Sequence, residues 1–210
     1  MSDLVFYTNP MSRGRIVRWM LEEVGAPYRA EIVAYGPQMK GADYLAVNPM
    51  GKVPSLVHGD AVVTEAAAIC AYLADAFPEA GLAPDPASAE RGAYYRWLFF
   101  GAGPVEQAVT AKALGLVVPD DKRGMVGFGS LDLVLDTLEG QLAKNDYIAG
   151  RSFTAADIYV GAQIGWGMQF GTIDKRAVFE RYVGNITSRP ACVRARDIDD
   201  KLVAESQGQA

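Results

Sequence analysis

The sequence of 210 residues predicts an α/β domain with a mixed sheet, followed by an all-α domain. Up to residue 78, short apolar runs typical of strands alternate with stretches of helical periodicity. Beyond residue 87, the periodicity is helical almost to the end of the chain. Between these parts, Pro84 and Pro86 exclude a helix and indicate a linker at residues 79–87. We therefore expect one domain over residues 1–78 and a second over residues 88–210.

The first domain is expected to alternate strands and helices. Its elements in order are a strand at 4–7, a helix ending at Gly25, a strand at 28–33, a helical turn at 44–47, a hairpin at 55–63 and a helix at 66–77. His58 falls in the predicted hairpin turn, where we expect it to be exposed to solvent. This order implies a mixed sheet with helices packed on its faces.

The second domain is expected to be helical throughout. Its predicted helices cover residues 89–114, 122–144, 155–170, 175–187 and 191–205. The third of these starts at a predicted capping box, in which the Thr154 hydroxyl accepts from the N–H of Asp157 and the Asp157 carboxylate accepts from the N–H of Thr154. Phe153 and Ile158 flank the box at the positions of a hydrophobic staple. Loss of the Thr154 hydroxyl should cost ~1 kcal/mol.

Composition argues against several classes of protein. A net charge of −5 disfavours a nucleic-acid partner, because phosphates reward basic surfaces. No window holds the ~18 uninterrupted apolar residues of a membrane helix, and the N-terminal residues lack the pattern of a secretory signal. We expect a cytoplasmic protein without membrane contact, in which Cys70 and Cys192 remain thiols. No metal site is expected.

The segment at residues 48–54 (NPMGKVP) is suited to binding a peptide. Its prolines force the backbone into an extended or turned shape that leaves donors and acceptors unused. A ligand amide could pair with the main chain of Val53 as an added strand. A ligand carboxylate could bind the free N–H groups where the helix near Glu65 begins. These residues therefore predict a site for a small anionic peptide.

Segments in this order resemble the cytosolic glutathione transferases, and the resemblance extends over the whole chain. The segments are residues 6–12 (FYTNPMS), 52–54 (KVP), 65–66 (EA) and 153–158 (FTAADI). The resemblance implies a thioredoxin-like first domain that binds glutathione and a helical second domain that holds the other substrate. It also implies a homodimer that uses glutathione as co-substrate, with a small hydrophobic electrophile as its partner in the reaction.

Conjugation needs the glutathione thiolate, so the protein must lower a thiol pKa of ~8.5. A hydroxyl hydrogen bond to the anion, worth ~1.5–3 kcal/mol, could lower it together with a helix N-terminus. Ser12 opens the first predicted helix and matches the catalytic position of the branches of the family that use Ser or Cys. A purely structural N-cap is its alternative role. Other branches use a tyrosine near this strand end, which makes Tyr7 the second candidate, and Thr8 and Asn9 remain candidate donors as well.

The resemblance also places residues at the bound tripeptide, namely Lys52, Val53, Pro54, Glu65, Ala66, Met39 and Lys40. Val53 would offer its main chain to the cysteinyl unit, next to a Pro54 that is expected to be cis. Glu65 would hold the ligand's ammonium group, or would only complement the helix dipole. Ala66 departs from the Ser that the family usually has, so binding should be weaker by ~0.5–1.5 kcal/mol.

Three arginines follow Ser12 in the first predicted helix. Arg13 and Arg15 lie in its first turn, where cations oppose the helix dipole by ~0.3–1 kcal/mol each. Attraction of anionic glutathione and surface ion pairing explain them equally well. Arg18 and Glu22 are four residues apart, so we expect an ion pair between them.

The pocket for the acceptor substrate is expected to be apolar, with Met11, Phe100, Trp166 and Phe170 as candidate lining residues. Most aromatic residues of a helical domain belong to its core, which is the alternative role of these. Two other functions stay open. The protein could be a glutathione-dependent disulfide-bond reductase, as are some bacterial relatives that use Thr or Asn in the first loop, or a non-catalytic module that binds glutathione or a partner.

Overall fold

The computed structural model describes residues 4–208, and their contacts divide the chain into two compact units. The first unit holds the chain up to Gly81 together with the segment from Ser188 onward. The second unit spans Leu82–Thr187. The expected fold class, a mixed sheet with helices followed by a helical region, is confirmed.

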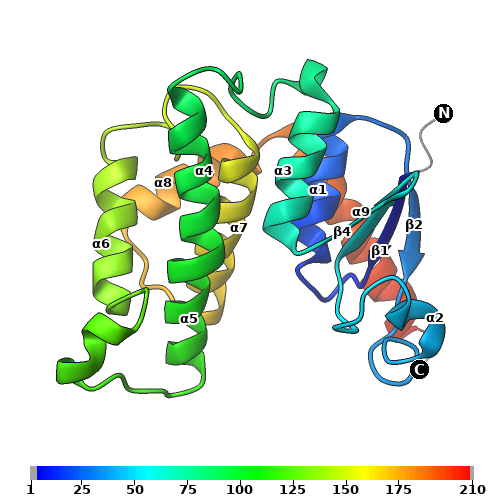
Figure 1. The fold of residues 1–210 in the computed structure, drawn as a ribbon, viewed down its shortest axis with the longest axis horizontal. Helices are drawn as coiled ribbons and strands as arrows, with labels where there is room; N and C mark the ends of the chain where they lie inside the picture. The colour runs from blue at the N-terminus through cyan, green and yellow to red at the C-terminus, as the bar shows by residue number, and fades with distance from the viewer. Residues whose placement is uncertain (1–3, 209–210) are drawn as a thin grey trace. The chain divides into compact units, whose positions relative to one another are not determined.

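A four-stranded mixed sheet forms the centre of the first unit (Figure 1). Its strands are β1 (Leu4–Thr8), β2 (Arg29–Ile32), β3 (Ser55–His58) and β4 (Ala61–Thr64), in the spatial order β2-β1-β3-β4. β1 runs parallel to β2 and antiparallel to β3, and β3 and β4 form the expected hairpin. Along β1, buried residues alternate with half-buried ones, which is the period of two that a strand imposes on its side chains.

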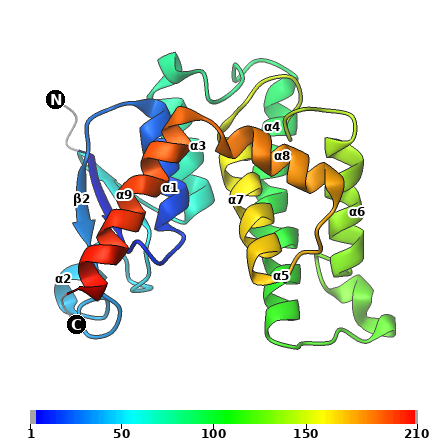
Figure 2. The same ribbon diagram turned by 180° about the vertical axis from the view of Figure 1, so that it is seen from behind.

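Helices cover both faces of this sheet. They are α1 (Gly14–Val24), α2 (Ala42–Leu45), α3 (Ala66–Ala76) and α9 (Pro190–Gln207). Figure 1 shows α1 and α3 on one side of the sheet and the short α2 on the other. α9 lies along α1, as Figure 2 shows from behind, so this last helix packs within the first unit.

The expected ion pair between Arg18 and Glu22 is wrong. Arg18 Nε instead donates to Asp199 Oδ1 of α9 at 2.8 Å, and both side chains are almost fully buried. Glu22 accepts from the Tyr28 hydroxyl and pairs with Arg194 of α9. Burial raises the pKa of Asp199, and the neighbouring Arg18 opposes this shift. The difference arises because a carboxylate far away in the sequence reaches α1 through tertiary packing.

The expected exposure of His58 is wrong as well. Its ring is half-buried at the end of β3, and its Nδ1 lies 2.9 Å from the Tyr72 hydroxyl of α3. The ring also stacks on Phe77, with 5.8 Å between the ring centroids. The hairpin turn is where the sequence placed it, but the following helix covers the imidazole.

The second unit is built from helices around a central α7. Its helices are α4 (Glu90–Phe100), α5 (Glu106–Ala113), α6 (Leu131–Leu142), α7 (Ala155–Phe170) and α8 (Ala177–Thr187). α7 packs against both α4 and α8. The expected helix at 89–114 is interrupted by a π-helical turn at Gly101–Val105, where a Cβ on Gly101 would come within 3.0 Å of the Tyr159 ring.

The helix predicted at 122–144 begins later than expected. A short 3₁₀ turn covers Asp120–Met125, and α6 starts only after Ser130, whose hydroxyl accepts from the Leu133 N–H at 3.2 Å. Gly129, just before this cap, has a φ of +63°, which a helix cannot include. A capping serine and a glycine thus set the start that hydrophobic periodicity alone placed too early.

The predicted capping box at the start of α7 is confirmed. Asp157 is fully buried, and its Oδ2 accepts from the Thr154 N–H at 2.9 Å. Its Oδ1 accepts from the Ile148 N–H at 2.7 Å and from the Tyr182 hydroxyl at 2.9 Å. Burial raises the pKa of Asp157, and these donors oppose the shift.

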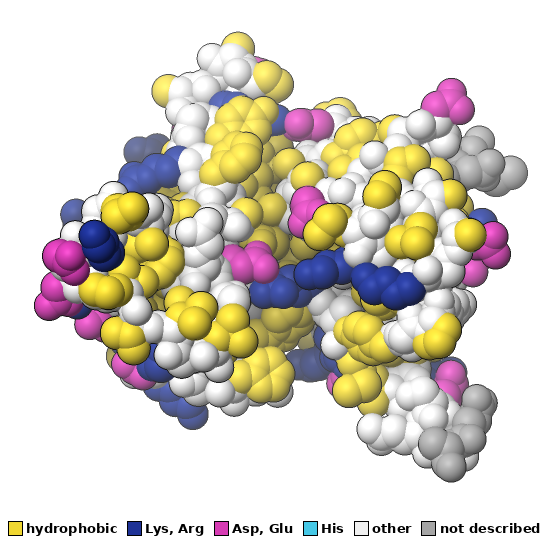
Figure 3. Space-filling view, turned by 60° about the horizontal axis from the view of Figure 1, so that its bottom comes forward, with side chains coloured by type: hydrophobic (Ala, Val, Ile, Leu, Met, Phe, Trp, Pro, Cys, Tyr) yellow, Lys and Arg dark blue, Asp and Glu magenta, His cyan; other side chains and the backbone are white. Residues whose placement is uncertain are grey.

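None of the helices in residues 4–208 is both long enough and apolar enough to cross a membrane. On the face shown in Figure 3, hydrophobic side chains are interspersed with charged ones. In the second unit, the connection between α5 and α6 carries several exposed apolar side chains, namely Leu116, Val117 and Met125.

Candidate functional site

The segments that the sequence singled out in the first unit meet at one end of the sheet. Tyr7 of β1 is paired with Ser55 of β3, and Ser55 is paired with Thr64 of β4. The loop after β1, the loop at 48–54 and the start of α3 therefore leave the sheet side by side. This end of the sheet is the candidate functional site.

Asn9 holds the loop after β1 in place. Its Nδ2 donates to the Val33 carbonyl at 3.0 Å, and its Oδ1 accepts from the Met11 N–H at 3.0 Å. The side chain is buried, with 8% of its surface exposed. Asn9 therefore stabilises the loop through hydrogen bonds of both its side-chain Nδ2 and its Oδ1.

The Ser12 hydroxyl links this loop to the start of α1. Its Oγ donates to the Asn9 carbonyl at 2.7 Å and accepts from the Gly14 N–H at 2.9 Å. The second bond gives Ser12 a structural contact at the start of α1, although the N-cap residue of this helix is Arg13. The side chain is half-buried, and its proton can turn toward a ligand while the Gly14 N–H keeps the oxygen in place.

The hydroxyls of Thr8 and Ser12 both lie next to Gly14 at the start of α1. A Cβ on Gly14 would overlap Thr8 Oγ1 and would lie 3.0 Å from Ser12 Oγ, so only glycine lets both hydroxyls approach the start of α1. Thr8 Oγ1 is fully buried and has no hydrogen-bond partner within residues 4–208. In this arrangement its hydroxyl does not reach the surface of the site.

Tyr7 points toward the face of the sheet that carries α2. Its ring packs against Val33, Met39 and Tyr44, and the centroids of the Tyr7 and Tyr44 rings lie 5.7 Å apart. Met39, expected at the glycyl end of the ligand, is 6% exposed in this cluster. The side chains of Tyr7 and Met39 therefore form part of a small apolar core behind the site.

Polar side chains fix the main chain of the loop at 48–54. The Tyr44 hydroxyl donates to the Lys52 carbonyl at 2.6 Å, and Asn48 Nδ2 donates to the same carbonyl at 2.8 Å. The Tyr44 hydroxyl also lies 2.9 Å from Ser55 Oγ. Burial raises the pKa of Tyr44, which keeps the phenol protonated and able to donate.

The peptide bond between Val53 and Pro54 is cis, as expected. The main-chain N–H and C=O of Val53 form no hydrogen bond with the described residues. Both groups are therefore available to an extended ligand, which is the geometry of strand addition.

Lys40 and Gly51 shape the other side of this loop. Lys40 Nζ donates to the carbonyls of Met50 at 3.0 Å and of Gly51 at 2.8 Å. Gly51 has a φ of +56°, and a Cβ there would come within 2.8 Å of the Met39 carbonyl. Lys40 thus has a structural role at the loop, whereas the side chain of Lys52 is exposed.

The start of α3 completes the candidate site. Glu65 has a φ of 68°, and it is the sole non-glycine residue with positive φ within residues 4–208. Its side chain is exposed, and its carbonyl accepts from the Ile69 N–H at 2.9 Å. The N–H groups of the first residues, from Ala66 onward, have no carbonyl of their own helix to bind. Backbone strain beside free donors is typical of binding sites.

Arg15 connects the loop after β1 with α9. Its Nε donates to the Pro10 carbonyl at 2.5 Å, and its Nη1 pairs with Asp200 at 2.7 Å. For this arginine, ion pairing is therefore the explanation that the contacts support.

The residues expected at the acceptor pocket are divided between the two units. Met11 belongs to the first unit and is exposed. In the second unit, the Phe100 ring lies 5.3 Å from that of Trp97, and Trp166 and Phe170 are one turn apart on α7. Phe170 is 73% exposed. Their roles at a substrate stay predictions.

The two cysteines remain thiols, as expected. Cys70 is buried in α3 and Cys192 is half-buried in α9, and neither forms a disulfide. Burial raises the pKa of Cys192 to about 11 and the pKa of Cys70 further still. Among the described residues, no cluster of three or more His, Cys, Asp and Glu side chains could hold a metal ion.

Comparison with known proteins identifies the class. Residues 11–76 match the family described as "Glutathione S-transferase, N-terminal domain", and residues 110–190 match "Glutathione S-transferase, C-terminal domain". Glutathione S-transferase 3 of Zea mays is 33% identical over 168 residues, which cover 75% of this chain and 75% of that protein.

Solved structures agree with this class. A glutathione transferase from Methylococcus capsulatus has a TM-score of 0.77 at 29% identity, over 94% of this chain and 98% of its own. A sphingomonad glutathione S-transferase complexed with glutathione has a TM-score of 0.74 at 29% identity, over 93% and 98%. A sheet-bearing unit with a cis-proline loop, joined to a helical unit, defines a thioredoxin-like protein of this kind. The chain belongs to the glutathione S-transferase family.

Proposed function

We propose that this protein is a cytoplasmic, homodimeric glutathione transferase of the bacterial Ser type. It joins the sulfur of glutathione to a small hydrophobic electrophile. The observation that carries the proposal is the meeting of Ser12, the Val53 main chain and the start of α3 at one end of the sheet. The glutathione bound in the sphingomonad relative supports the choice of ligand.

The tripeptide is held mainly by main-chain groups. Its cysteinyl unit pairs with the N–H and C=O of Val53 beside the cis Pro54. Its γ-glutamyl carboxylate binds the free N–H at Ala66, and its ammonium group binds the exposed Glu65 carboxylate. The exposed Lys52 favours the glycyl carboxylate by charge, and Lys40, whose Nζ donates to the Met50 and Gly51 carbonyls, adds positive charge at the same loop. Ala66 adds no side-chain hydroxyl to this set.

Ser12 stabilises the thiolate. The Ser12 proton turns from the Asn9 carbonyl to the ligand sulfur, while the Gly14 N–H continues to hold Oγ. The thiol proton leaves to solvent, and the sulfur lone pair forms a C–S bond with the electrophilic carbon. With a chlorinated nitrobenzene, the C–Cl bond breaks and chloride leaves with its electron pair.

The geometry favours Ser12 over the other candidate donors. Tyr7 packs on the α2 face of the sheet, and Thr8 Oγ1 is buried next to Gly14. The side-chain Nδ2 and Oδ1 of Asn9 both already form hydrogen bonds within the chain. Ser12 is half-exposed, and its hydroxyl donates only to a neighbouring main-chain carbonyl, so this donor can be redirected to a ligand.

The test is Ser12→Ala, with conjugation of a chlorinated nitrobenzene as readout. Loss of a hydrogen bond to an anion should lower kcat/KM by roughly 10- to 100-fold and shift the pH–rate profile toward higher pH. Ser130→Ala is the matched control, because the Ser130 hydroxyl also accepts from a main-chain N–H at a helix start and lies in the other unit. Loss of activity in Tyr7→Phe but not in Ser12→Ala would move the role to Tyr7.

Two other outcomes would replace the proposal. Turnover of a small mixed disulfide without any conjugation would make the protein a disulfide-bond reductase. Absence of both activities, with glutathione still raising the Tm, would leave a glutathione-binding module. If calorimetry detected no uptake of glutathione at millimolar concentrations, all three readings would fall.

A further inference from the structure

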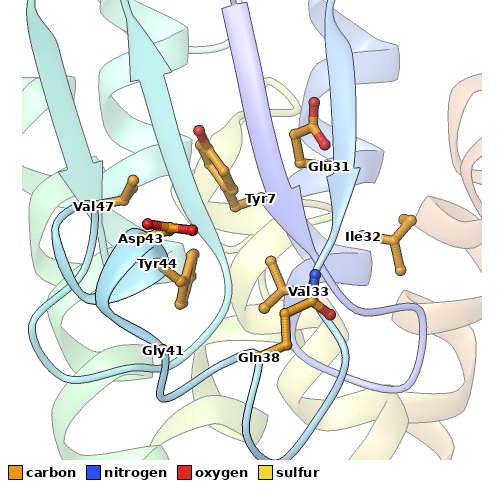
Figure 4. Close-up of a pocket in the computed structure, with 9 residues that line it drawn as sticks. All are labelled: Tyr7, Glu31, Ile32, Val33, Gln38, Gly41, Asp43, Tyr44 and Val47. Atoms are coloured by element: carbon orange, nitrogen blue, oxygen red, sulfur yellow. The ribbon is translucent and has the colours of Figure 1, made fainter.

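A concavity separate from the candidate site lies on the α2 face of the sheet, within the first unit. Its volume is about 320 Å³, and it is lined by residues of β1, β2 and the α2 region (Figure 4). None of the residues that we assign to the bound tripeptide lines it. Ligand pockets of proteins start at roughly 300 Å³, so the cavity admits a molecule with about one aromatic ring.

The lining combines an apolar wall with an acidic edge. Figure 4 shows Tyr7 between Glu31 of β2 on one side and Asp43, Tyr44 and Val47 of the α2 region on the other. The lining therefore offers aromatic rings, an aliphatic side chain and two carboxylates. Among the nine described residues of the lining, there is no Lys, Arg or His.

The two carboxylates remain accessible to a ligand. Asp43 is exposed and forms no ion pair with the described residues. Glu31 pairs with Arg29, but both side chains are largely exposed, at 43% and 64%. A surface pair of this kind contributes little stability, so a bound cation can replace it.

From these features we propose that the cavity binds a small organic ammonium ion with an apolar, preferably aromatic, body. The body would lie against the Tyr7 ring and the edge of Tyr44, and the ammonium group would face Asp43, with Glu31 across the cavity adding a weaker attraction. Aromatic rings attract cations through their quadrupole, which adds to the attraction of the carboxylates. An anionic ligand of the same shape would be repelled.

A ligand in the cavity should change the glutathione affinity of the tripeptide site; this inference rests on the proposed function. The Tyr44 hydroxyl holds the Lys52 carbonyl, and the Val33 carbonyl holds Asn9 of the loop before Ser12. Two residues of the lining thus anchor both loops of the candidate site. A ligand that shifts either of them changes glutathione affinity, and glutathione changes the affinity for that ligand by the same factor.

The test compares three probes with one body: 2-phenylethylamine, 2-phenylethanol and 3-phenylpropionate. Binding is followed by amide chemical shifts in the isotope-labelled full chain. We expect the amine to shift residues of the lining and to bind about two- to fivefold more tightly than the alcohol, as an exposed charge pair allows. The propionate should bind most weakly. Equal affinity of amine and propionate, or no saturable shift with the amine, would overturn the proposal.

Two variants locate the site. Asp43→Asn should lower the affinity of the amine toward that of the alcohol, whereas Asp60→Asn, which alters an exposed carboxylate in the β3–β4 hairpin, should leave it unchanged. Val47→Trp should fill the cavity and abolish binding of both the amine and the alcohol. Unchanged amine binding in Asp43→Asn, which alters only an exposed side chain, would refute the assignment even if Val47→Trp failed to fold.

The last measurement separates this proposal from the proposed function. At saturating amine, the glutathione Kd should change about fivefold. An unchanged Kd would overturn the coupling between the sites. If glutathione did not bind at all, the proposed function would fall, while the chemical shifts would still decide whether the cavity takes an ammonium ion.

Discussion

The starts of α7 and α3 differ in how their free main-chain N–H groups are satisfied, and they differ in backbone as well, since Thr154 is extended and Glu65 has a φ of 68°. At α7, the buried Asp157 carboxylate accepts hydrogen bonds from Thr154, Ile148 and Tyr182, so the polar groups there are satisfied within the chain. At α3, Glu65 leaves its carboxylate in solvent and is followed by Ala66, which has no side chain to cap the free N–H groups. We call a helix start saturated when its polar groups have hydrogen-bond partners within the chain, and unsaturated when its first N–H groups have none. A saturated start stabilises the fold, whereas an unsaturated start can bind a ligand.

The start of α1 is intermediate between these two. Ser12 satisfies the Gly14 N–H, as a cap does, but its proton is bound only to a neighbouring carbonyl and its side chain is half-exposed. Such a hydroxyl can contribute to both stability and chemistry. The same residue type at Ser130, where it accepts from the Leu133 N–H, has only the structural task in our scheme.

The largest effect should come from breaking the saturated start. Asp157→Ala leaves several buried donors without an acceptor, and we expect a loss of about 3–5 kcal/mol in the free energy of unfolding. Urea unfolding measures it. Asp132→Ala is the matched control, an exposed acidic residue in the first turn of α6 that should cost at most about 1 kcal/mol. Equal costs for the two variants would show that the network around Asp157 adds nothing.

The next effect concerns the chain's own thiols, which should take no part in chemistry at the site. Burial raises the pKa of Cys192 to about 11 from an ordinary value of 9.0. At pH 8 its thiolate fraction should therefore be about a hundredfold below that of an unperturbed thiol, and labelling by a disulfide reagent should be slowed to match.

The pH dependence has a definite sign. Because only the thiolate reacts, the labelling rate of Cys192 should rise about tenfold per pH unit until the pH approaches 11. The variant Cys192→Ser identifies which thiol gives the signal, since Cys70 is fully buried. Labelling of the folded protein at the rate of free cysteine would contradict the burial of this group.

Local patterns made the candidate site largely predictable. The loops around Ser12, Val53 and Glu65 were recognised from short motifs, and strand pairing then brought them together. The capping box at Thr154 was predicted in the same way, because it depends on residues only a few positions apart, whereas the cis bond before Pro54 was expected from the family resemblance alone. Structural features that involve only residues close together in the chain can be predicted from the sequence.

Long-range partners were not predictable in this way. Arg18 was paired with Glu22 because the two are near in sequence, whereas its partner is Asp199, 181 residues away. A signal did exist: Ala191, Ala195 and Asp199 recur every four residues, which puts the carboxylate on the apolar face of α9. A buried charge on such a face requires a partner, but the sequence does not say which element supplies it.

Tyr44 offers a smaller test of how the site is supported. Tyr44→Phe removes the hydrogen bonds to the Lys52 carbonyl and to Ser55 Oγ. With Asn48 still bound to that carbonyl, we expect a loss of about 1 kcal/mol in glutathione binding, or roughly fivefold in Kd. Tyr28→Phe, whose hydroxyl contacts Arg18 and Glu22 on the other side of the first unit, should leave the Kd unchanged. An unaltered Kd in Tyr44→Phe would mean that Asn48 alone holds the loop.

Glu65 provides the smallest effect and the most direct test of an unsaturated start. Its φ of 68° is unfavourable for any residue except glycine, by about 1–2 kcal/mol, so Glu65→Gly relieves strain while it removes the carboxylate. Because glycine also gains freedom in the unfolded chain, the net increase in the free energy of unfolding should be about 0.5–1 kcal/mol. Glu65→Gln keeps the strain and should leave stability unchanged. Both variants should bind glutathione more weakly than the parent, because neither can pair with its ammonium group. Urea unfolding and calorimetry on the three proteins separate the two contributions, and a Glu65→Gly variant less stable than Glu65→Gln would show that the strained residue is held by contacts of its side chain instead.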